Sequence, residues 1–173
     1  MCIIAIKPKR SSIELETLET CFNNNPDGAG FMFNSGKKVY GVKGFMKWDE
    51  FKQAIDIMGF LDEKKESVIY DDPIVFHFRI ATAGSITPGN CHPFPVTTVI
   101  PMLRATSWTE NIGVAHNGII DVSLIDKDMV SLTDDLSDTQ IFIARFMAYR
   151  GVRKKLRRSG VVTMIEGVTT GSK

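Results

Sequence analysis

Residues 1–8 read MCIIAIKP, and the prediction of the fold starts from this stretch. Residues 2–6 are apolar and rich in β-branched side chains, and Pro8 follows shortly after them. A short apolar run bounded by a residue that cannot donate to a β-ladder is typical of a buried strand. The sequence therefore predicts a strand that begins at a thiol.

Cys2 directly follows the initiator methionine, so removal of Met1 would leave a residue with both a thiol and a free α-amine. An unperturbed cysteine has a pKa near ~8.5 and is mostly protonated at neutral pH, whereas an α-amine titrates at about 7.7–8.0. Such an amine can act as the general base for its own thiol, through a bridging water. The alternative is that Cys2 is only an early strand residue.

Length and composition bound the class of protein. The 173 residues, 43% hydrophobic and 24% charged, fit one globular domain over residues 1–173. No apolar run approaches the ~18 residues of a membrane span, and the apolar N-terminal run is too short for a signal peptide. The three cysteines form no Cys-x-x-Cys pair. We therefore expect a cytoplasmic protein without structural disulfides.

The charge is uneven along the chain, although the net charge is only +1. Residues 150–173 hold seven Lys and Arg against one acid, or +6, which leaves 14 against 19, or −5, in residues 1–149. Six of the tail cations lie within residues 150–158. This run is typical of a solvated helix face, and nucleic-acid binding, the less favoured interpretation, is the alternative.

Capping and periodicity signals predict a mixture of helices and strands. Ser11 with Glu14 has the form of a capping box, and Leu15, Leu18 and Phe22 then share one helical face. The same kinds of signal predict a hairpin over residues 31–40, a helix over 48–60, and a second helix from the Ser137–Gln140 capping box to about Tyr149. Further strands are predicted at residues 74–80, 96–100, 112–115 and 161–165.

Residues 115–118, Ala-His-Asn-Gly, lie at the end of a predicted strand. Cleavage of a carboxamide places negative charge on its oxygen, which an Asn side chain and a backbone N–H beside a glycine can stabilise. Asn117 and Gly118 are therefore candidates for an oxyanion hole. Asn-Gly is also the commonest tight-turn dipeptide, so an ordinary turn is the alternative.

Two charged residues are candidates for substrate binding. Arg79 ends the strand that carries His77, and an arginine at a strand end suits bidentate capture of a carboxylate; the alternative is a surface ion pair. Asp138 begins a predicted helix, where an acid complements the helix dipole in any case. Its functional alternative is to bind an ammonium group of the ligand.

Together these residues resemble the class II glutamine amidotransferases, which are N-terminal-nucleophile amide hydrolases. The turn and loop motifs also resemble stand-alone versions, including ones encoded by phages. The resemblance covers residues 2 to about 147 and leaves the basic tail, residues 150–173, unassigned. The matching stretches are Cys2, residues 25–30 (NPDGAG), 77–82 (HFRIAT), 92–93 (HP), 116–118 (HNG) and 137–139 (SDT).

The resemblance implies a role for each of these positions. It makes Cys2 the nucleophile and its α-amine the base, with Asn117 and the Gly118 N–H as the oxyanion hole. The other implied roles are binding of the glutamine α-carboxylate by Arg79, binding of its α-ammonium by Asp138, and lining of the pocket by Thr82. Glutamine would acylate the thiol, release ammonia and leave a thioester for water to cleave.

The implied fold is α+β, a four-layer αββα sandwich of two antiparallel sheets faced by helices. The chain departs from the family in having Ile3 after the cysteine, where glycine is common, and Ala83 where many members have histidine. Further strands usually follow the helix that begins at Asp138. Since this chain ends soon after that helix, we expect a truncated second sheet.

Family members usually carry a synthase domain that consumes the ammonia. With glutamine as the substrate, this chain would either pass the ammonia to a separate synthase partner or hydrolyse glutamine freely. No cofactor or metal is required. Three alternatives stay open: a hydrolase for another amide such as a γ-glutamyl compound, a non-catalytic nucleic-acid-binding module that uses the basic tail, and a Cys91–His92 protease or metal site. The metal alternative would draw on Cys21, His77, Cys91, His92 and His116.

Overall fold

The computed structural model describes residues 1–81, 85–122, 136–156 and 158. Its largest element is a five-stranded antiparallel sheet with the strand order β1-β6-β3-β4-β8. Together with the helices that flank it, this sheet confirms the expected α+β class. The strands are β1 (Ile3–Lys7), β3 (Ala29–Ser35), β4 (Lys38–Phe45), β6 (Ile74–Phe78) and β8 (Ser107–Glu110).

The predicted hairpin is confirmed as β3 and β4, which pair in register from Gly30 opposite Lys43 to Ser35 opposite Lys38. Gly36 in the connecting turn has a φ of 62°, a conformation that glycine adopts without strain. The side chains of β3 alternate between the two faces of the sheet, so Phe31 and Phe33 are both buried on one face.

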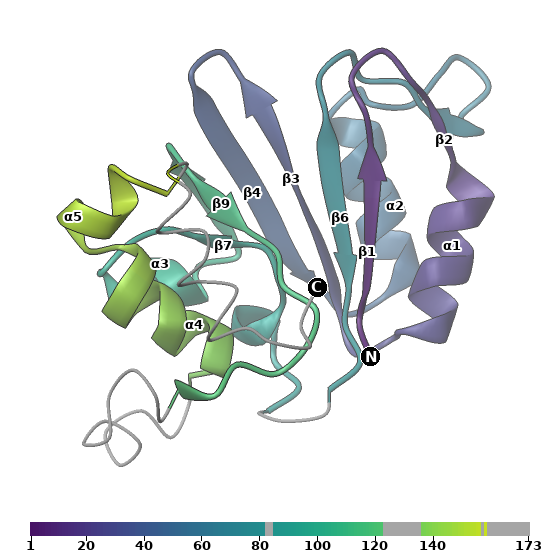
Figure 1. Ribbon diagram of the computed structural model, residues 1–173. Helices are drawn as coiled ribbons and strands as arrows, with labels where there is room; N and C mark the ends of the chain where they lie inside the picture. The colour runs from purple at the N-terminus through teal and green to yellow at the C-terminus, as the bar shows by residue number, and fades with distance from the viewer. Residues whose placement is uncertain (82–84, 123–135, 157, 159–173) are drawn as a thin grey trace.

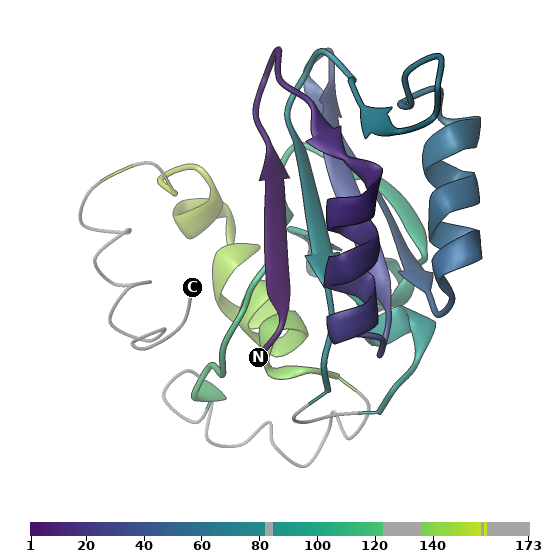
Figure 2. The ribbon, with the colours of Figure 1, turned by 90° about the vertical axis from the view of Figure 1, so that its right-hand side faces the viewer.

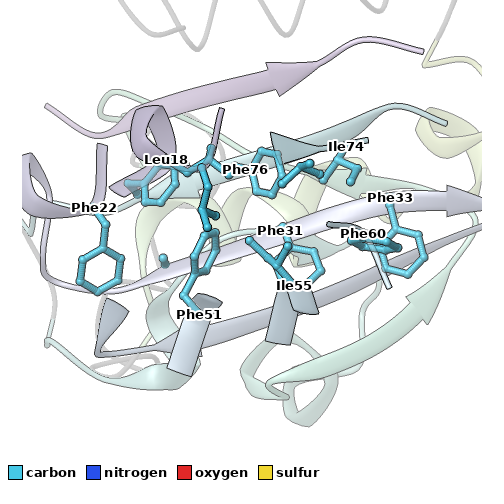
Figure 3. Packing of buried hydrophobic residues seen from close by; sticks show 13 residues of the cluster. Leu18, Phe22, Phe31, Phe33, Phe51, Ile55, Phe60, Ile74 and Phe76 are labelled. Carbon is cyan, nitrogen blue, oxygen red and sulfur yellow. The ribbon is translucent and has the colours of Figure 1, made fainter. Parts of the chain in front are cut away.

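Two helices cover that face, as Figures 1 and 2 show from two sides. They are α1 (Leu15–Asn24) and α2 (Trp48–Ile57). Figure 3 shows the aromatic core between these helices and the sheet. Its members include Leu18, Phe22, Phe31, Phe51, Ile55 and Phe76. The predicted apolar face of α1 is confirmed, because Leu15, Leu18 and Phe22 are all buried.

The opposite face of the sheet is covered by a second layer (Figure 2), which holds a smaller core. This core draws on a two-stranded sheet of β7 (Phe94–Pro95) and β9 (Gly113–Val114), and on the helical segments α3 (Ile100–Arg104), α4 (Asp138–Phe142) and η3 (Ile143–Met147). Two further helical segments are η1 (Pro88–Asn90) and α5 (Arg150–Arg153). Phe94, Leu103 and Ile143 are fully buried in this core. The chain thus forms one core on each face of its main sheet.

Lys43 connects β4 to this second layer through hydrogen bonds of its side chain. Its side chain is buried, and Nζ donates to the carbonyl oxygens of Gly89 and Leu103, each at 2.8 Å. Nζ also lies 3.8 Å from the centroid of the Phe94 ring. Gln140 Nε2 donates to the same two carbonyls, at 3.3 and 3.1 Å. Burial lowers the pKa of Lys43 to about 7.

Several sequence predictions are corrected by the structure. Ser11 and Glu14 form no capping box, because Ser11 Oγ donates to Pro8 O, and Glu14 instead accepts from Ser67 Oγ. Glu14 belongs to β2 (Ile13–Glu14), which pairs with β5 (Ser67–Val68), and neither strand was predicted. Residues 96–100 are not a strand, since Pro101 occupies the first turn of helix α3.

Other predictions hold or cannot be compared. The strand at residues 74–80 is confirmed over Ile74–Phe78, the helix at 48–60 over Trp48–Ile57, and the capping box of Ser137 and Gln140 is present with both of its hydrogen bonds. The predicted strand at 161–165 lies outside the described residues. None of the helices in the described part of the chain is long and apolar enough to cross a membrane.

Candidate functional site

A pocket of about 180 Å³ lies where β1 begins and β6 ends. The antiparallel pairing of Ile3 with Phe78 brings these two strand ends together, although they are far apart in the sequence. Four of the residues singled out by the sequence line the pocket, together with Asn90, His92 and His116; the four are Cys2, Arg79, Gly118 and Asp138. The fold thus gathers most of the predicted site in one place.

Cys2 enters this pocket from the start of β1. Its Sγ lies 3.6 Å from the carbonyl oxygen of Ile80, a residue that also lines the pocket. Met1 precedes it and is 87% exposed. The thiol therefore faces the pocket, while Met1 projects into solvent.

Asn117 and Gly118 follow β9 and meet Cys2 from the other side. Asn117 Nδ2 donates to the backbone carbonyl oxygen of Cys2 at 2.7 Å. A carboxamide nitrogen has two N–H groups, so this contact uses one of them. Gly118 has a φ of 143°, which side-chain-bearing residues rarely adopt, and it lines the pocket. The pair lies beside Cys2, although Asn117 itself contacts Cys2 rather than lining the cavity.

Arg79 follows β6 and is only 5% exposed. Its backbone is fixed on both sides by the turn at residues 27–28, because Arg79 N donates to Gly28 O at 2.8 Å and Asp27 N donates to Arg79 O at 3.0 Å. Its Nη1 donates to the carbonyl oxygen of Ser85 at 3.0 Å. A guanidinium fixed in this way faces the pocket with a defined orientation.

Asp138 is the first residue of α4. Its Oδ2 accepts from Ile120 N at 2.7 Å, and its Oδ1 accepts from Thr139 N at 2.6 Å. The capping box of Ser137 and Gln140 fixes the same helix start. Oδ1 also accepts from Thr139 Oγ1 at 3.3 Å, and these hydrogen bonds hold the carboxylate in place.

One predicted residue cannot be compared, and several pocket residues were not predicted. Thr82 lies outside the described residues. Asn90, His92 and His116 line the pocket without having been assigned a role in it. The sequence signal for the two histidines was their place in the matched His-Pro and His-Asn-Gly stretches; for Asn90 we find none.

The three histidines form a buried cluster, and two of them, His92 and His116, line the pocket. The rings of His77 and His92 stack with their centroids 4.3 Å apart. His77 Nε2 donates to His116 O at 3.0 Å, and His116 Nδ1 lies 3.1 Å from Thr139 Oγ1. Burial lowers the pKa of His77 to about 4, and it also lowers the pKa values of His92 and His116. At neutral pH these imidazoles are uncharged.

The low pKa of His77 predicts a loss of stability in acid. Between pH 6.5 and about 4, the unfolded chain binds a proton at this residue and the folded chain does not. The free energy of unfolding should therefore fall as the pH drops through this window, by about 3 kcal/mol from His77. Urea unfolding of the wild type and of His77→Gln between pH 4.5 and 7.5 measures the difference. Parallel pH dependences of the two proteins would contradict this prediction.

Cys91 lacks the features of a nucleophile. It is fully buried, its Sγ lies 3.6 Å from Thr87 O, and burial raises the pKa of its thiol. Neither ring nitrogen of His92 has a hydrogen-bond partner among the described residues, so no Cys91–His92 pair forms. In the same part of the chain, no group of three or more His, Cys, Asp or Glu residues is placed to hold a metal ion.

A larger groove, of about 690 Å³, lies elsewhere, between the face of β3, β4 and β6 and the segments around β9 and α5. Its walls are mainly apolar, with Met32, Val75 and Val114 among them. Arg153, on its rim, forms an ion pair with Glu110 at 2.8 Å. The groove holds no cysteine or histidine, so the smaller pocket at Cys2 is the site suited to covalent chemistry.

A scan against protein-family models and a search of curated proteins find no match to this chain. The activity of the site is therefore inferred from its own residues.

Proposed function

We propose that the protein hydrolyses the side-chain amide of glutamine to glutamate and ammonia, with Cys2 as the nucleophile. One observation carries the proposal. A thiol, a guanidinium, a carboxylate and a glycine with an unusual backbone conformation come from four separate stretches of the chain and line one pocket. These are the groups that a glutamine amidohydrolase needs for attack, oxyanion stabilisation and recognition of an amino acid.

The reaction begins once Met1 has been removed. The α-amine of Cys2 takes the thiol proton through a water molecule, and the sulfur attacks the carbonyl carbon of the side-chain amide. The negative charge on the amide oxygen is stabilised by the second N–H of Asn117 and by the backbone N–H of Gly118. The tetrahedral species collapses as the C–N bond breaks, and the nitrogen leaves as ammonia with a proton from the α-ammonium. A water molecule then cleaves the thioester and restores the thiol.

The amino-acid end of glutamine is bound by the two charged residues of the pocket. Arg79 pairs with the α-carboxylate and Asp138 accepts from the α-ammonium. The pocket volume of about 180 Å³ lies below the range of about 300–1,000 Å³ that is usual for drug-sized ligands. A cavity of this size suits a single amino acid rather than a peptide.

The proposal extends to the architecture, an αββα arrangement in which the second sheet is reduced to β7 and β9. What supports it is the layer order: α1 and α2 lie on one face of the main sheet, and β7, β9, α3 and α4 lie on the other. Cys2 lies directly before β1, which is the strand at one edge of the main sheet as described.

The cellular setting follows from the chemistry. A free thiol must persist, and Cys2, Cys21 and Cys91 are all free, so a reducing cytoplasmic compartment is part of the proposal. The ammonia released at Cys2 is either freed or passed to a separate synthase. The protein itself needs no cofactor for the reaction as written.

The role of Arg79 separates glutamine from other amide substrates. Arg79→Gln should raise the KM for glutamine about 10- to 150-fold, because a hydrogen bond to a charged group contributes about 1.5–3 kcal/mol. Glutamate release measured at several glutamine concentrations tests this expectation. Arg104→Gln, at an exposed position on α3, is the matched control and should leave KM unchanged.

The same assay distinguishes the alternative substrate class. If the wild type cleaves an amide that has no α-carboxylate faster than glutamine, and Arg79→Gln does not affect that rate, the site does not bind the amino-acid end of its substrate. A γ-glutamyl compound keeps the α-carboxylate, so faster cleavage of such a compound that still depends on Arg79 would identify it instead. Either result would overturn glutamine as the substrate while leaving Cys2 as the nucleophile.

A further inference from the structure

Asn25 is buried and touches the peptide that must be cleaved. The residue is only 4% exposed, and its Nδ2 donates to the carbonyl oxygen of Met1 at 2.8 Å. Asn117 Nδ2 donates to the next carbonyl oxygen, that of Cys2. Two asparagine amides therefore hold the nucleophilic residue, one on each side of its Cα.

The backbone of Asn25 is firmly placed. Asn25 is the C-cap residue of α1, and its backbone N–H donates to Cys21 O and Phe22 O, both at 3.1 Å. The turn that follows is fixed to the end of β6, because Asp27 N donates to Arg79 O and Asp27 Oδ2 accepts from Ala81 N at 2.8 Å. The Asn-Pro-Asp-Gly turn, a matched stretch to which the sequence analysis assigned no role, thus fixes a side chain at the N-terminus.

Removal of Met1 leaves this side chain beside the new amine. In a peptide unit the carbonyl oxygen and the following nitrogen are both bonded to one carbon, at about 1.23 and 1.33 Å. The group that Asn25 contacts at Met1 is therefore directly adjacent to the nitrogen that becomes the α-amine of Cys2. A buried carboxamide that loses its partner is costly, and rotation of the amide presents Oδ1 to the amine as an acceptor.

We propose that Asn25 is a positioning residue for the α-amine of Cys2, an inference that rests on the proposed function. Its Oδ1 accepts one N–H of the amine and so directs the nitrogen lone pair towards the thiol and the bridging water. A neutral amide orients the amine without holding it in the protonated form, as a carboxylate would.

The charged and titratable groups of the pocket and of the turn that carries Asn25 define the background for the test. Arg79 and Asp138 line the pocket, as do the imidazoles of His92 and His116. Asp27, on the same turn as Asn25, is bonded to the backbone of Ala81. A substitution at residue 25 that changes only its charge leaves all of these groups in place.

The test is Asn25→Asp, with Asn24→Asp as a matched control one residue away at an exposed position. Mass spectrometry first confirms that each protein begins at Cys2. The pH dependence of kcat/KM for glutamine and of Cys2 alkylation by iodoacetamide is then measured. We expect Asn25→Asp to raise the apparent pKa of the acid limb by at least about 1, since a carboxylate favours the ammonium form, and to lower kcat/KM at pH 7 about 10-fold. Asn24→Asp should match the wild type.

The outcomes separate this inference from the proposed function. Thermal melting first shows whether Asn25→Asp is folded. If the wild type releases glutamate and the folded variant keeps the wild-type pH profile, the role of Asn25 is refuted and the glutaminase proposal stands. If the wild type does not act on glutamine, the proposed function fails, and the alkylation profile alone still decides the contact between Asn25 and the amine.

A second pair of variants applies if Asn25→Asp does not fold. Asn25→Ser retains an acceptor and Asn25→Ala does not. At pH 7, Cys2 of the serine variant should therefore be alkylated at least about 5-fold faster than Cys2 of the alanine variant, and glutamine turnover should differ by the same factor. A factor of this size is expected from the loss of one hydrogen bond. Equal losses in the two variants would overturn the proposal.

Discussion

Cys2→Ser is expected to lower glutamate release from glutamine by at least about 10³-fold, because removal of a covalent nucleophile eliminates the acyl-enzyme route. The serine hydroxyl is close in size to the thiol but far less acidic, so the α-amine cannot activate it comparably. Steady-state assays with matched protein concentrations measure the effect. Binding of glutamine should change little, since Arg79 and Asp138 remain in the pocket.

Two further cysteine substitutions serve as controls for this result. Cys21→Ser, on α1 and outside the pocket, should keep wild-type activity. Cys91→Ser should keep the chemistry even if it reduces stability, because Cys91 is fully buried. Activity that survives in Cys2→Ser and disappears in Cys91→Ser would show that the wrong thiol has been assigned.

Asn117→Ala is expected to lower kcat by about 10²–10³-fold with little change in KM, the usual result of removing one oxyanion-hole donor. The contact of Asn117 with Cys2 O places its amide beside the nucleophile. Kinetics of glutamine hydrolysis, together with a melting temperature for each protein, separate a catalytic loss from a folding defect.

Asn111→Ala is the matched control for this second prediction. Asn111 is an exposed asparagine between β8 and β9, and it lies outside the Cys2 pocket. Its substitution should leave kcat unchanged. If Asn117→Ala raised KM and spared kcat, Asn117 would be binding the ground state of the substrate, and another donor would have to stabilise the oxyanion.

Much of the main sheet could be predicted from the sequence because its signals are local. The apolar run of β1, the Asn-Ser-Gly turn between β3 and β4, and the spacing of Phe51 and Ile55 on α2 each specify an element within a few residues. Elements that depend on distant partners were missed. The edge strand β8 has no apolar run, and its Trp108 is buried by distant partners: β8 pairs with β4, and Trp108 Nε1 donates to Pro93 O at 3.2 Å.

Two errors have different causes. Glu14 was predicted to cap α1, but Ser67 on β5 competes for its carboxylate, and this competitor is 53 residues away in the sequence. Residues 96–100 are apolar and β-branched, yet Pro101 lies in the first turn of helix α3, which begins at Ile100. Local propensity gave way to tertiary contacts in the first case and to proline chemistry in the second.

The candidate site was more predictable than the loops around it. Cys2, Arg79, Gly118 and Asp138 each stand at the start or end of a predicted element, so a correct element order is enough to suggest that they converge. Asn25 and the buried histidine cluster were not assigned roles. Their environment exists only after β6 pairs with β1 and packs against the second layer, which no local pattern encodes.

The central claim is that the sulfur of an N-terminal Cys2 forms the bond to the substrate. A glutamine analogue with an electrophilic diazoketone in place of the side-chain amide traps such a nucleophile. After reaction, peptide mapping by mass spectrometry should find one adduct, on the sulfur of Cys2, in chains that begin at Cys2. An adduct on Cys21 or Cys91, or equal labelling of chains that retain Met1, would contradict the account.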